Sequence, residues 1–354
     1  MTTRVLVVED SLTVRAWLVA ALTADPEFDV VGEAEDGAAA IELCRRSKPD
    51  VVTMDMMLRG LSGLAATEAI MESCPTPILI VSASTNRGEL FRTYDALAAG
   101  AVDVLEKPTG REPDGEWAAS FRAQVRLVSR IRVITHHHPA RAARKSAVSL
   151  PRGPGAGTSC RAIAIGASTG GPAAIVSVLG GLPADFPLPI LLVIHIGQAF
   201  ARSLAEWLDG LSPIRVSTAA DGDPLPPPGC GCVLMPPADR HLEVRDGRIR
   251  VGAGPERHSC RPSVDVLFES AAADLGPAVA GCLLTGMGRD GADGLLAIRR
   301  AGGQTIAQDE ESCVVFGMPR EAITLGAAGR VLPLPQISAA LLQLAGSAPA
   351  KERR

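Results

Sequence analysis

Short apolar runs alternate with amphipathic patterns over the first 108 residues. Ser11–Asp25 repeats apolar residues at a helical period and starts with a serine suited to cap a helix. The apolar runs predict five buried strands, at Val5–Val8, Val30–Ala34, Val51–Met54, Ile78–Val81 and Val102–Leu105. Strands that alternate with helices in this way predict a parallel, doubly wound sheet.

The same alternation returns over residues 159–346. The sequence Asp246-Gly247 lies between two short apolar runs and predicts a β-hairpin. The other predicted strands are Arg161–Ile165, Ile190–Ile194, Arg215–Thr218, Cys232–Met235, Val279–Leu284 and Gln304–Ala307. We therefore expect a second doubly wound, mostly parallel α/β domain.

The stretch between these two patterns has a different composition. Trp117, Phe121 and Val125 recur every fourth residue and predict the last helix of a first domain that covers residues 1–125. Residues 126–158 are the expected flexible linker, because His136–Ser159 is rich in Arg, Ala, Pro and Gly and has no apolar period.

The composition fits a globular protein of two domains. The 354 residues are 47% hydrophobic and 21% charged, with a formal net charge of −4 that indicates neither a nucleic-acid-binding nor a membrane surface. The N-terminal residues lack a signal-peptide pattern, and the apolar run Leu188–Ile196 is too short to span a bilayer, so we expect a cytoplasmic protein. Eight cysteines without a Cys-x-x-Cys pair predict neither a zinc site nor a disulfide framework.

Chemically active side chains end successive strands of the first domain. Glu9 and Asp10 follow the first strand and Asp55 follows the third, so three carboxylates should meet at one edge of the sheet. Oxygen ligands of this kind suit Mg²⁺. Ser82 and Lys107 end the fourth and fifth strands and add a hydroxyl and a positive charge. Each carboxylate alone is interpretable as a helix cap, but five groups at one edge favour a phosphoryl-transfer site.

Residues 3–108 resemble the response-regulator receiver family. The matching motifs are VVED at 7–10, PDVVTMD at 49–55, VSAS at 81–84 and EKP at 106–108. The resemblance implies a flavodoxin-like (βα)5 fold in which Asp55 is the phosphoacceptor and Glu9, Asp10 and Asp55 hold Mg²⁺. It also implies that Ser82 and Lys107 sense the phosphoryl group.

The sequence departs from the usual receiver pattern near the acceptor. Met57-Leu58 and Ser62-Gly63 stand where receivers usually have Met-Pro and Asp-Gly. Val104 occupies a position, three before the lysine, that is often aromatic. We therefore expect intact phosphorylation chemistry but a different coupling to the output domain.

A glycine-rich turn follows the first strand of the second domain. Residues 166–172 are GASTGGP, which places Ser168 in the Gly-x-Ser-x-Gly pattern of a nucleophile elbow. The glycines allow a sharp turn, and the following helix offers free amides that suit an oxyanion. A phosphate-binding loop is the alternative, although the P-loop lysine is missing, and a purely structural turn is also possible on this motif alone.

A serine nucleophile needs a base and an orienting carboxylate. His195 ends the next predicted strand on the same edge as Ser168, whereas His241 and His258 are interpretable as surface histidines. Asp290 follows a later strand in another glycine-rich turn, where a helix cap and a triad member are equally plausible. The order Ser168, His195, Asp290 differs from the Ser-Asp-His order of ordinary α/β-hydrolases.

Residues 160–334 resemble the methylesterase domain of the CheB family. The matching segments are IGASTGGP at 165–172, ADGDPLPPPG at 220–229, PPADRHLEV at 236–244, RPSVDVLFES at 261–270, LLTGMGRDGADGL at 283–295 and TIAQDEESCVVFGMPREAI at 305–323. The resemblance implies that Ser168 is the nucleophile, His195 the general base and Asp290 its partner. It places Thr169, Gly170 and Met287 at the substrate pocket and oxyanion region.

One segment around the histidine differs from the family. CheB proteins usually have Gln-His-Met before proline-rich residues, and this chain has Ile194-His195-Ile196-Gly197-Gln198 while keeping Phe200. We expect catalysis to be retained and the pocket to differ in shape on that side.

The two resemblances together imply a phosphorylation-regulated hydrolase of chemotaxis adaptation. It would demethylate glutamate methyl esters and deamidate glutamines on methyl-accepting chemoreceptors, and a sensor histidine kinase would supply the phosphoryl group. Mg²⁺ would serve the receiver, and the hydrolase site would need no cofactor. A non-catalytic signalling adaptor and a nucleotide-binding regulator are the rival hypotheses.

Overall fold

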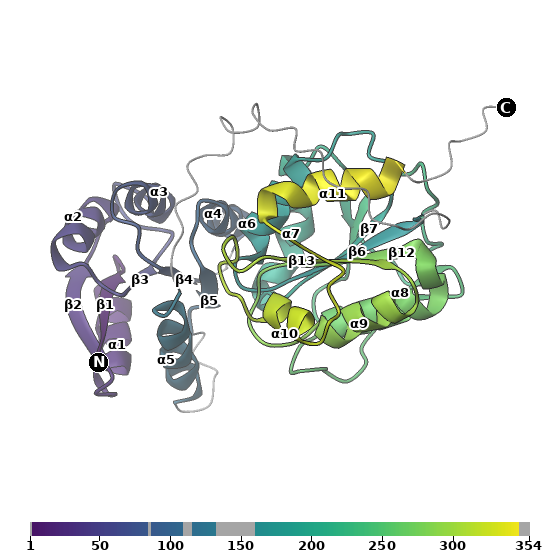
Figure 1. Ribbon diagram of the computed structural model, residues 1–354. Helices are drawn as coiled ribbons and strands as arrows, with labels where there is room; N and C mark the ends of the chain where they lie inside the picture. Colours follow the sequence, from purple (N-terminus) through teal and green to yellow (C-terminus); the bar gives the residue numbers. More distant parts are fainter. Residues whose placement is uncertain (1, 84–85, 109–114, 132–159, 347–354) are drawn as a thin grey trace.

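The computed structural model describes residues 2–83, 86–108, 115–131 and 160–346. Figure 1 shows two α/β domains side by side, with the N-terminal domain in purple and slate and the C-terminal domain in teal, green and yellow. The expected α/β class is confirmed for both domains.

The N-terminal domain has a five-stranded parallel sheet in the order β2-β1-β3-β4-β5. This order is that of flavodoxin-like folds. Helices α1 and α5 contribute to the core on one face, and α2, α3 and α4 cover the other. The elements are β1 (Thr3–Val8), α1 (Leu12–Thr23), β2 (Phe28–Ala34), α2 (Gly37–Ser47), β3 (Val51–Met54), α3 (Gly63–Ser73), β4 (Ile78–Ser82), α4 (Arg87–Ala98), β5 (Asp103–Glu106) and α5 (Glu116–Val128).

Local sequence explains where these elements begin. Ser11 caps α1 as expected, since its hydroxyl accepts a hydrogen bond from the Val14 amide. The β3 and β4 strands are buried along their whole length, and for that reason apolar residues predominate in their sequences, VVTM and ILIVS.

The end of the first domain differs from the expectation. The expected linker begins at residue 126, but α5 continues to Val128, because the side chains of Val128 and Ile131 are buried in the same core as Phe121. The rest of the expected linker, including His136–His138, lies outside the described residues.

The C-terminal domain has a seven-stranded sheet in the order β14-β13-β12-β6-β7-β9-β8, with every pairing parallel. Helices α6, α7 and α11 pack on one face, and α8, α9 and α10 pack on the other. The sheet strands are β6 (Ala162–Ala167), β7 (Ile190–Ile194), β8 (Val216–Thr218), β9 (Val233–Met235), β12 (Val279–Leu283), β13 (Gln304–Gln308) and β14 (Arg330–Leu332). The helices are α6 (Gly171–Gly180), α7 (Gln198–Leu211), α8 (Val264–Leu275), α9 (Ala292–Arg300), α10 (Met318–Thr324) and α11 (Leu334–Gly346), and a 3-10 turn covers Gly276–Ala278.

The expected hairpin is present beside this sheet. Strands β10 (His241–Arg245) and β11 (Arg248–Gly252) pair antiparallel through Asp246 and Gly247, whose φ angles are 53° and 67°. Positive φ at both central residues is the type I′ turn that the Asp-Gly pair predicts.

The two domains meet through α4, which packs on α6 and α7. Tyr94 is fully buried there, donates its hydroxyl proton to the Phe200 carbonyl and packs against Trp207, with ring centroids 5.3 Å apart. The Trp207 indole donates to Asp95 at 2.8 Å, and Arg87 pairs with Glu206 at the rim. One apolar cluster therefore runs through both domains.

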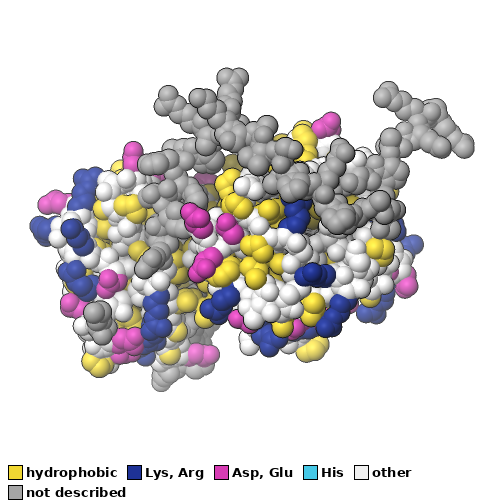
Figure 2. Space-filling view, in the orientation of Figure 1, with side chains coloured by type: hydrophobic (Ala, Val, Ile, Leu, Met, Phe, Trp, Pro, Cys, Tyr) yellow, Lys and Arg dark blue, Asp and Glu magenta, His cyan; other side chains and the backbone are white. Residues whose placement is uncertain are grey.

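The surface carries charged side chains of both signs. On the face shown in Figure 2, basic and acidic side chains are interspersed over the described residues. None of the described helices has both the length and the apolar character needed to cross a bilayer.

Candidate active site and phosphoryl site

Ser168 lies at the carboxyl end of β6, the strand at the point where the sheet order reverses direction. Ligands of doubly wound folds bind at such switch points. Its amide donates to the Thr285 carbonyl at 3.0 Å, and its carbonyl accepts from Gly171 at 2.6 Å, which closes a tight turn into α6. The Ser168 side chain is half-buried, and among the described residues its hydroxyl makes no hydrogen bond.

The turn requires glycine at position 170. Gly170 has φ 75°, and a Cβ there would lie 2.5 Å from the Val314 side chain. Within the described residues, the amides of Thr169 and Gly170 donate to no acceptor, so they remain available at the N-terminal end of α6. Backbone amides at such an end stabilise negative charge.

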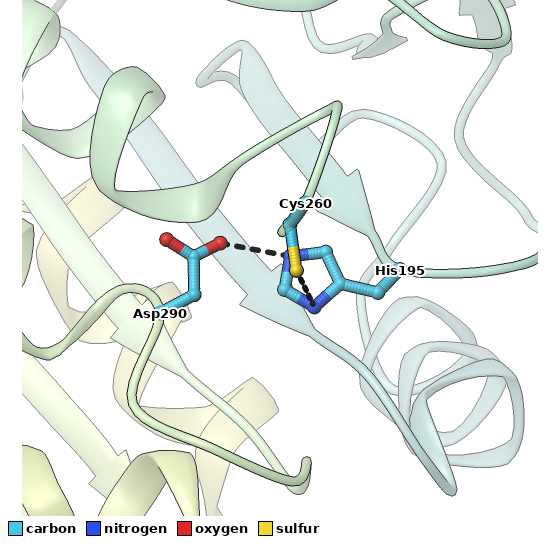
Figure 3. A group of neighbouring side chains, drawn as sticks. All are labelled: His195, Cys260 and Asp290. Carbon is cyan, nitrogen blue, oxygen red and sulfur yellow. Dashed lines mark hydrogen bonds and ion pairs between the residues drawn. The ribbon is translucent and has the colours of Figure 1, made fainter. Parts of the chain in front are cut away.

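His195 lies one strand away, directly after β7. Its amide donates to the Ala167 carbonyl at 2.9 Å, which places His195 next to the residue that precedes Ser168. The His195 Nε2 and Asp290 Oδ2 atoms are 2.8 Å apart, as Figure 3 shows. A carboxylate can only accept, so Nε2 carries the proton and Nδ1 is the ring nitrogen left for a nucleophile.

Asp290 is held by the N-terminus of α8 and not by α9. Its Oδ1 accepts from the Ser263 hydroxyl at 2.7 Å and from the Asp265 amide at 3.1 Å, and its Oδ2 also accepts from the Val264 amide at 2.7 Å. The N-cap of α9 is Gly291, which has no side chain to cap the helix. The sequence left Asp290 open as a cap of the following helix or as a partner of the histidine. In the structure Asp290 accepts from the N-terminal amides of α8 instead of α9, and it contacts His195 as well.

These contacts move the pKa values of His195 and Asp290 in opposite directions. Burial acts to raise the pKa of Asp290, but hydrogen bonds from His195, Ser263 and Val264 lower it to about 2. Burial acts to lower the pKa of His195, but the hydrogen bonds with Asp290 and Cys260 raise it to about 9. The pair therefore favours a charged aspartate that stabilises an imidazolium.

Cys260 is a site residue that the sequence analysis did not single out. Its sulfur lies 3.8 Å from His195 Nδ1, in front of the ring in Figure 3. Cys260 directly precedes the motif RPSVDVLFES, with two residues between it and Ser263, but no spacing rule connects it with His195.

The two other candidate histidines have structural partners. His241 is buried, receives the Ser263 amide proton on Nδ1 at 3.2 Å, and has the Pro255 carbonyl 3.1 Å from Nε2. His258 pairs with buried Asp265 at 3.1 Å. His195 is therefore the candidate base that lies beside Ser168.

The N-terminal domain touches the turn that carries Ser168. Thr169 donates its hydroxyl proton to Asp103 of β5 at 3.4 Å, and Val314 and Val315 pack against the N-terminal core. Met287, in contrast, is 54% exposed beside the site. The Asp103 contact links two domains and was not predicted from local sequence.

The five groups expected at the edge of the N-terminal sheet are largely brought together. Ligand atoms of Glu9, Asp10 and Asp55 lie within 4.8 Å of one another, and Lys107 Nζ is 2.8 Å from Glu9 and 3.0 Å from Asp55. Burial raises the pKa of both Glu9 and Asp55, which Lys107 opposes. Asp55 Oδ1 is buried without a protein donor, so this oxygen has a free site for a cation.

Ser82 lies at the expected strand end, but its hydroxyl donates to Glu89 at 2.8 Å and lies 3.4 Å from the Thr93 hydroxyl. Asp10 pairs with Arg59 at 3.4 Å. The Ser82 hydroxyl would have to leave Glu89 before it donates to another acceptor, whereas Asp10 pairs with Arg59 through Oδ2 alone and remains within 4.8 Å of the Glu9 and Asp55 ligand atoms.

Fold and site together define a two-domain protein with a receiver-like domain and a hydrolase-like domain. The family described as CheB methylesterase matches residues 163–341, and the response regulator receiver domain matches residues 5–113. The chain belongs to the CheB methylesterase family and carries a response regulator receiver domain.

Named relatives align over nearly the whole chain. A "protein-glutamate methylesterase/protein-glutamine glutaminase 2" of Anaeromyxobacter dehalogenans is 44% identical over 96% of both chains, and the protein of the same name from Pseudomonas aeruginosa has the same identity and coverage. The crystal structure of the Thermotoga maritima CheB methylesterase catalytic domain is 37% identical, covers 53% of this chain and 100% of that chain, and has a TM-score of 0.49.

Proposed function

We propose that this protein is a phosphorylation-regulated protein-glutamate methylesterase and protein-glutamine glutaminase of chemotaxis adaptation. Its substrates are methylated glutamates and glutamines on methyl-accepting chemoreceptors. The observation that carries the proposal is the His195–Asp290 pair beside the Ser168 turn, in a chain of the CheB family.

In the acylation step, Ser168 attacks the side-chain carbonyl of the receptor glutamate. The Nδ1 atom of His195 takes the hydroxyl proton, and Asp290 stabilises the resulting imidazolium through Nε2. The imidazolium then gives this proton to the leaving methoxide, and methanol departs. From a glutamine side chain, ammonia departs instead.

The free amides of the Ser168 turn supply the oxyanion site in this mechanism. Thr169 and Gly170 directly precede α6, whose N-terminus favours negative charge. Exposed Met287 supplies apolar surface for the receptor chain at the rim. Water deacylates the enzyme by the same proton transfers in reverse order, and free glutamate is released.

Cys260 is a second nucleophile near the base, with its sulfur 3.8 Å from His195 Nδ1. Ser168 is the better candidate because it lies at the start of a helix with free amides, whereas Cys260 ends a β-turn. A Ser168-centred mechanism therefore has an oxyanion site and a Cys260-centred one does not.

Methanol release from methylated receptors tests this assignment. We expect Ser168→Ala to lower kcat by roughly 10³-fold or more while the fold persists. Cys260→Ala is the matched comparison and should retain measurable turnover. Loss of turnover in Cys260→Ala but not in Ser168→Ala would reject Ser168 as the nucleophile.

The receiver domain controls this activity in our proposal. Glu9, Asp10 and Asp55 would hold Mg²⁺, which when bound neutralises charge on the incoming phosphoryl group. Asp55 accepts the phosphoryl group from a sensor histidine kinase, and Lys107 and Ser82 bind it. Phosphorylation then favours an arrangement in which α4 and Asp103 leave the catalytic domain and the Ser168 turn becomes accessible. The cytoplasm is the compartment that these partners imply.

A further inference from the structure

Thr285 lies beside the turn that carries Ser168, on the chain segment that follows β12. The pairing of β12 with β6 continues past the last residue of β12, since the Leu284 amide donates to the Gly166 carbonyl at 2.9 Å and the Ser168 amide donates to the Thr285 carbonyl at 3.0 Å. The Thr285 side chain is fully buried. Its hydroxyl therefore needs hydrogen-bond partners within the protein.

The Thr285 hydroxyl connects two chain segments. Its oxygen accepts from the Val315 amide at 2.9 Å, and its one proton goes to the Thr169 carbonyl at 3.0 Å. The Val315 carbonyl is farther from the hydroxyl, at 3.3 Å, and already accepts from the Gly286 amide at 3.0 Å. Among the described residues no amide donates to the Thr169 carbonyl, so the Thr285 hydroxyl is the donor that holds it.

The Thr169 carbonyl belongs to the same peptide unit as the Gly170 amide, and this peptide is trans. The C=O and N–H bonds of a trans peptide point in opposite directions, so a donor that fixes the carbonyl also fixes the direction of the N–H. Gly170 has no side chain to restrict the rotation of this peptide. We propose that Thr285 is a positioning residue for hydrolysis, because its hydroxyl fixes the peptide whose N–H serves as an oxyanion donor. This inference rests on the proposed function.

Thr285 is itself held firmly. Its amide donates to Gln308 Oε1 at 2.8 Å, and the side-chain amide of Gln308, which is fully buried on β13, donates to the Ser312 carbonyl at 2.7 Å. The Thr285 carbonyl is bound by the Ser168 amide. Threonine is branched at Cβ and has few χ1 rotamers. A hydroxyl on such a residue is fixed before the substrate arrives, as an effective oxyanion site requires.

The orientation of the Gly170 N–H affects the transition state more than substrate binding. Negative charge develops on the substrate oxygen only when Ser168 attacks, so loss of this orientation should lower kcat and leave KM nearly unchanged. Complete removal of one oxyanion donor typically costs about 10²–10³-fold in kcat. A donor that is present but less well directed should cost less, and we expect a loss of roughly 10- to 100-fold in Thr285→Val.

Thr305 offers a matched control on β13 of the same sheet. It is also buried, and its hydroxyl makes the same two kinds of hydrogen bond: it donates to the Ala327 carbonyl at 2.7 Å and accepts from the Gly329 amide at 2.8 Å. Neither partner belongs to the turn at Ser168. Thr305→Val therefore removes an equivalent buried hydroxyl and should lower the unfolding midpoint without changing kcat.

The test is methanol release from methylated receptors by the full-length protein with saturating phosphoryl donor, over a range of receptor concentrations. Thr285→Val and Thr285→Ala should lose kcat at nearly constant KM, and Thr285→Ser, which keeps the hydroxyl, should recover kcat to within roughly threefold of the wild type. Equal kcat values for Thr285→Val, Thr285→Ala and Thr305→Val would overturn the inference if Ser168→Ala is inactive. Full turnover by Ser168→Ala would instead reject the proposed function.

Hydrogen exchange of the turn is a second measurement that needs no activity. The Gly171 amide is protected by its bond to the Ser168 carbonyl at 2.6 Å. Exchange of the peptide that contains this turn should be faster in Thr285→Val than in the wild type or Thr305→Val, and unchanged exchange would overturn the positioning role. Faster exchange in Thr285→Val, in a protein whose wild type releases no methanol, would retain the hold on the peptide and reject the proposed function.

Discussion

Ser263 connects the N-terminus of α8 with Asp290, the carboxylate that contacts His195. Its hydroxyl donates to Asp290 at 2.7 Å and accepts from the Val266 amide at 3.3 Å, so it serves both the carboxylate and the helix. Ser263→Ala removes both interactions. Loss of a helix cap costs about 1 kcal/mol, and loss of a hydrogen bond to a charged group costs about 1.5–3 kcal/mol.

We therefore expect Ser263→Ala to lower the thermal unfolding midpoint and also to reduce kcat/KM. Asp290 keeps its contacts with Val264, Asp265 and His195, so the catalytic loss is partial. A fall of about tenfold corresponds to 1.4 kcal/mol of lost transition-state stabilisation, roughly the value of the missing hydrogen bond. Methanol release from methylated receptors measures it.

Ser270→Ala is the matched control. Ser270 lies on the same helix, accepts from the Val244 amide at 3.1 Å and does not contact Asp290. It should lower the unfolding midpoint without changing kcat/KM, whereas Ser263→Thr should restore much of both properties. Equal kcat/KM values for Ser263→Ala and Ser270→Ala would refute the argument that the hydroxyl tunes Asp290.

Three further predictions concern the receiver. Asp55→Asn should take up no label from a small-molecule phosphoryl donor, and EDTA should prevent labelling of the wild type; a label mapped to another residue contradicts this. Burial raises the pKa of Asp103 to about 6, so the cost of its charge to the folded state grows as the pH rises from the ordinary pKa of an aspartate to about 6 and is complete above that. Asp103→Asn should therefore raise the unfolding midpoint at pH 8 more than at pH 5, and an equal effect at both pH values refutes it. A chain that starts at Ser159 should demethylate receptors faster than the unphosphorylated full-length protein, and equal rates would mean that the receiver does not inhibit.

The strands were predictable because burial on both faces leaves an unmistakable apolar run, as in β3, β6 and β7. Strand β14 was not predicted, because it has only three residues and is partly exposed. The end of α5 was also placed too early, because the burial of Val128 and Ile131 is tertiary and leaves no local signal.

The site residues also fall into a group that the sequence identified and a group that it did not. Ser168, His195 and Asp290 were identified because each follows a strand, and parallel strands end at one edge. Cys260 and Ser263 belong to a turn and a helix start on a different layer, and only tertiary packing brings them to His195 and Asp290.

The position of β12 has a consequence for the timing of synthesis. This strand pairs with β6 in the middle of the sheet, and Asp290 follows it, so 95 residues separate His195 from its carboxylate. A ribosome-bound chain that already displays Ser168 and His195 has neither the strand that completes the centre of the sheet nor the acid that orients the base. Esterase activity should therefore appear only after Asp290 has been made, and a partly synthesised chain that ends before β12 should not act on a receptor.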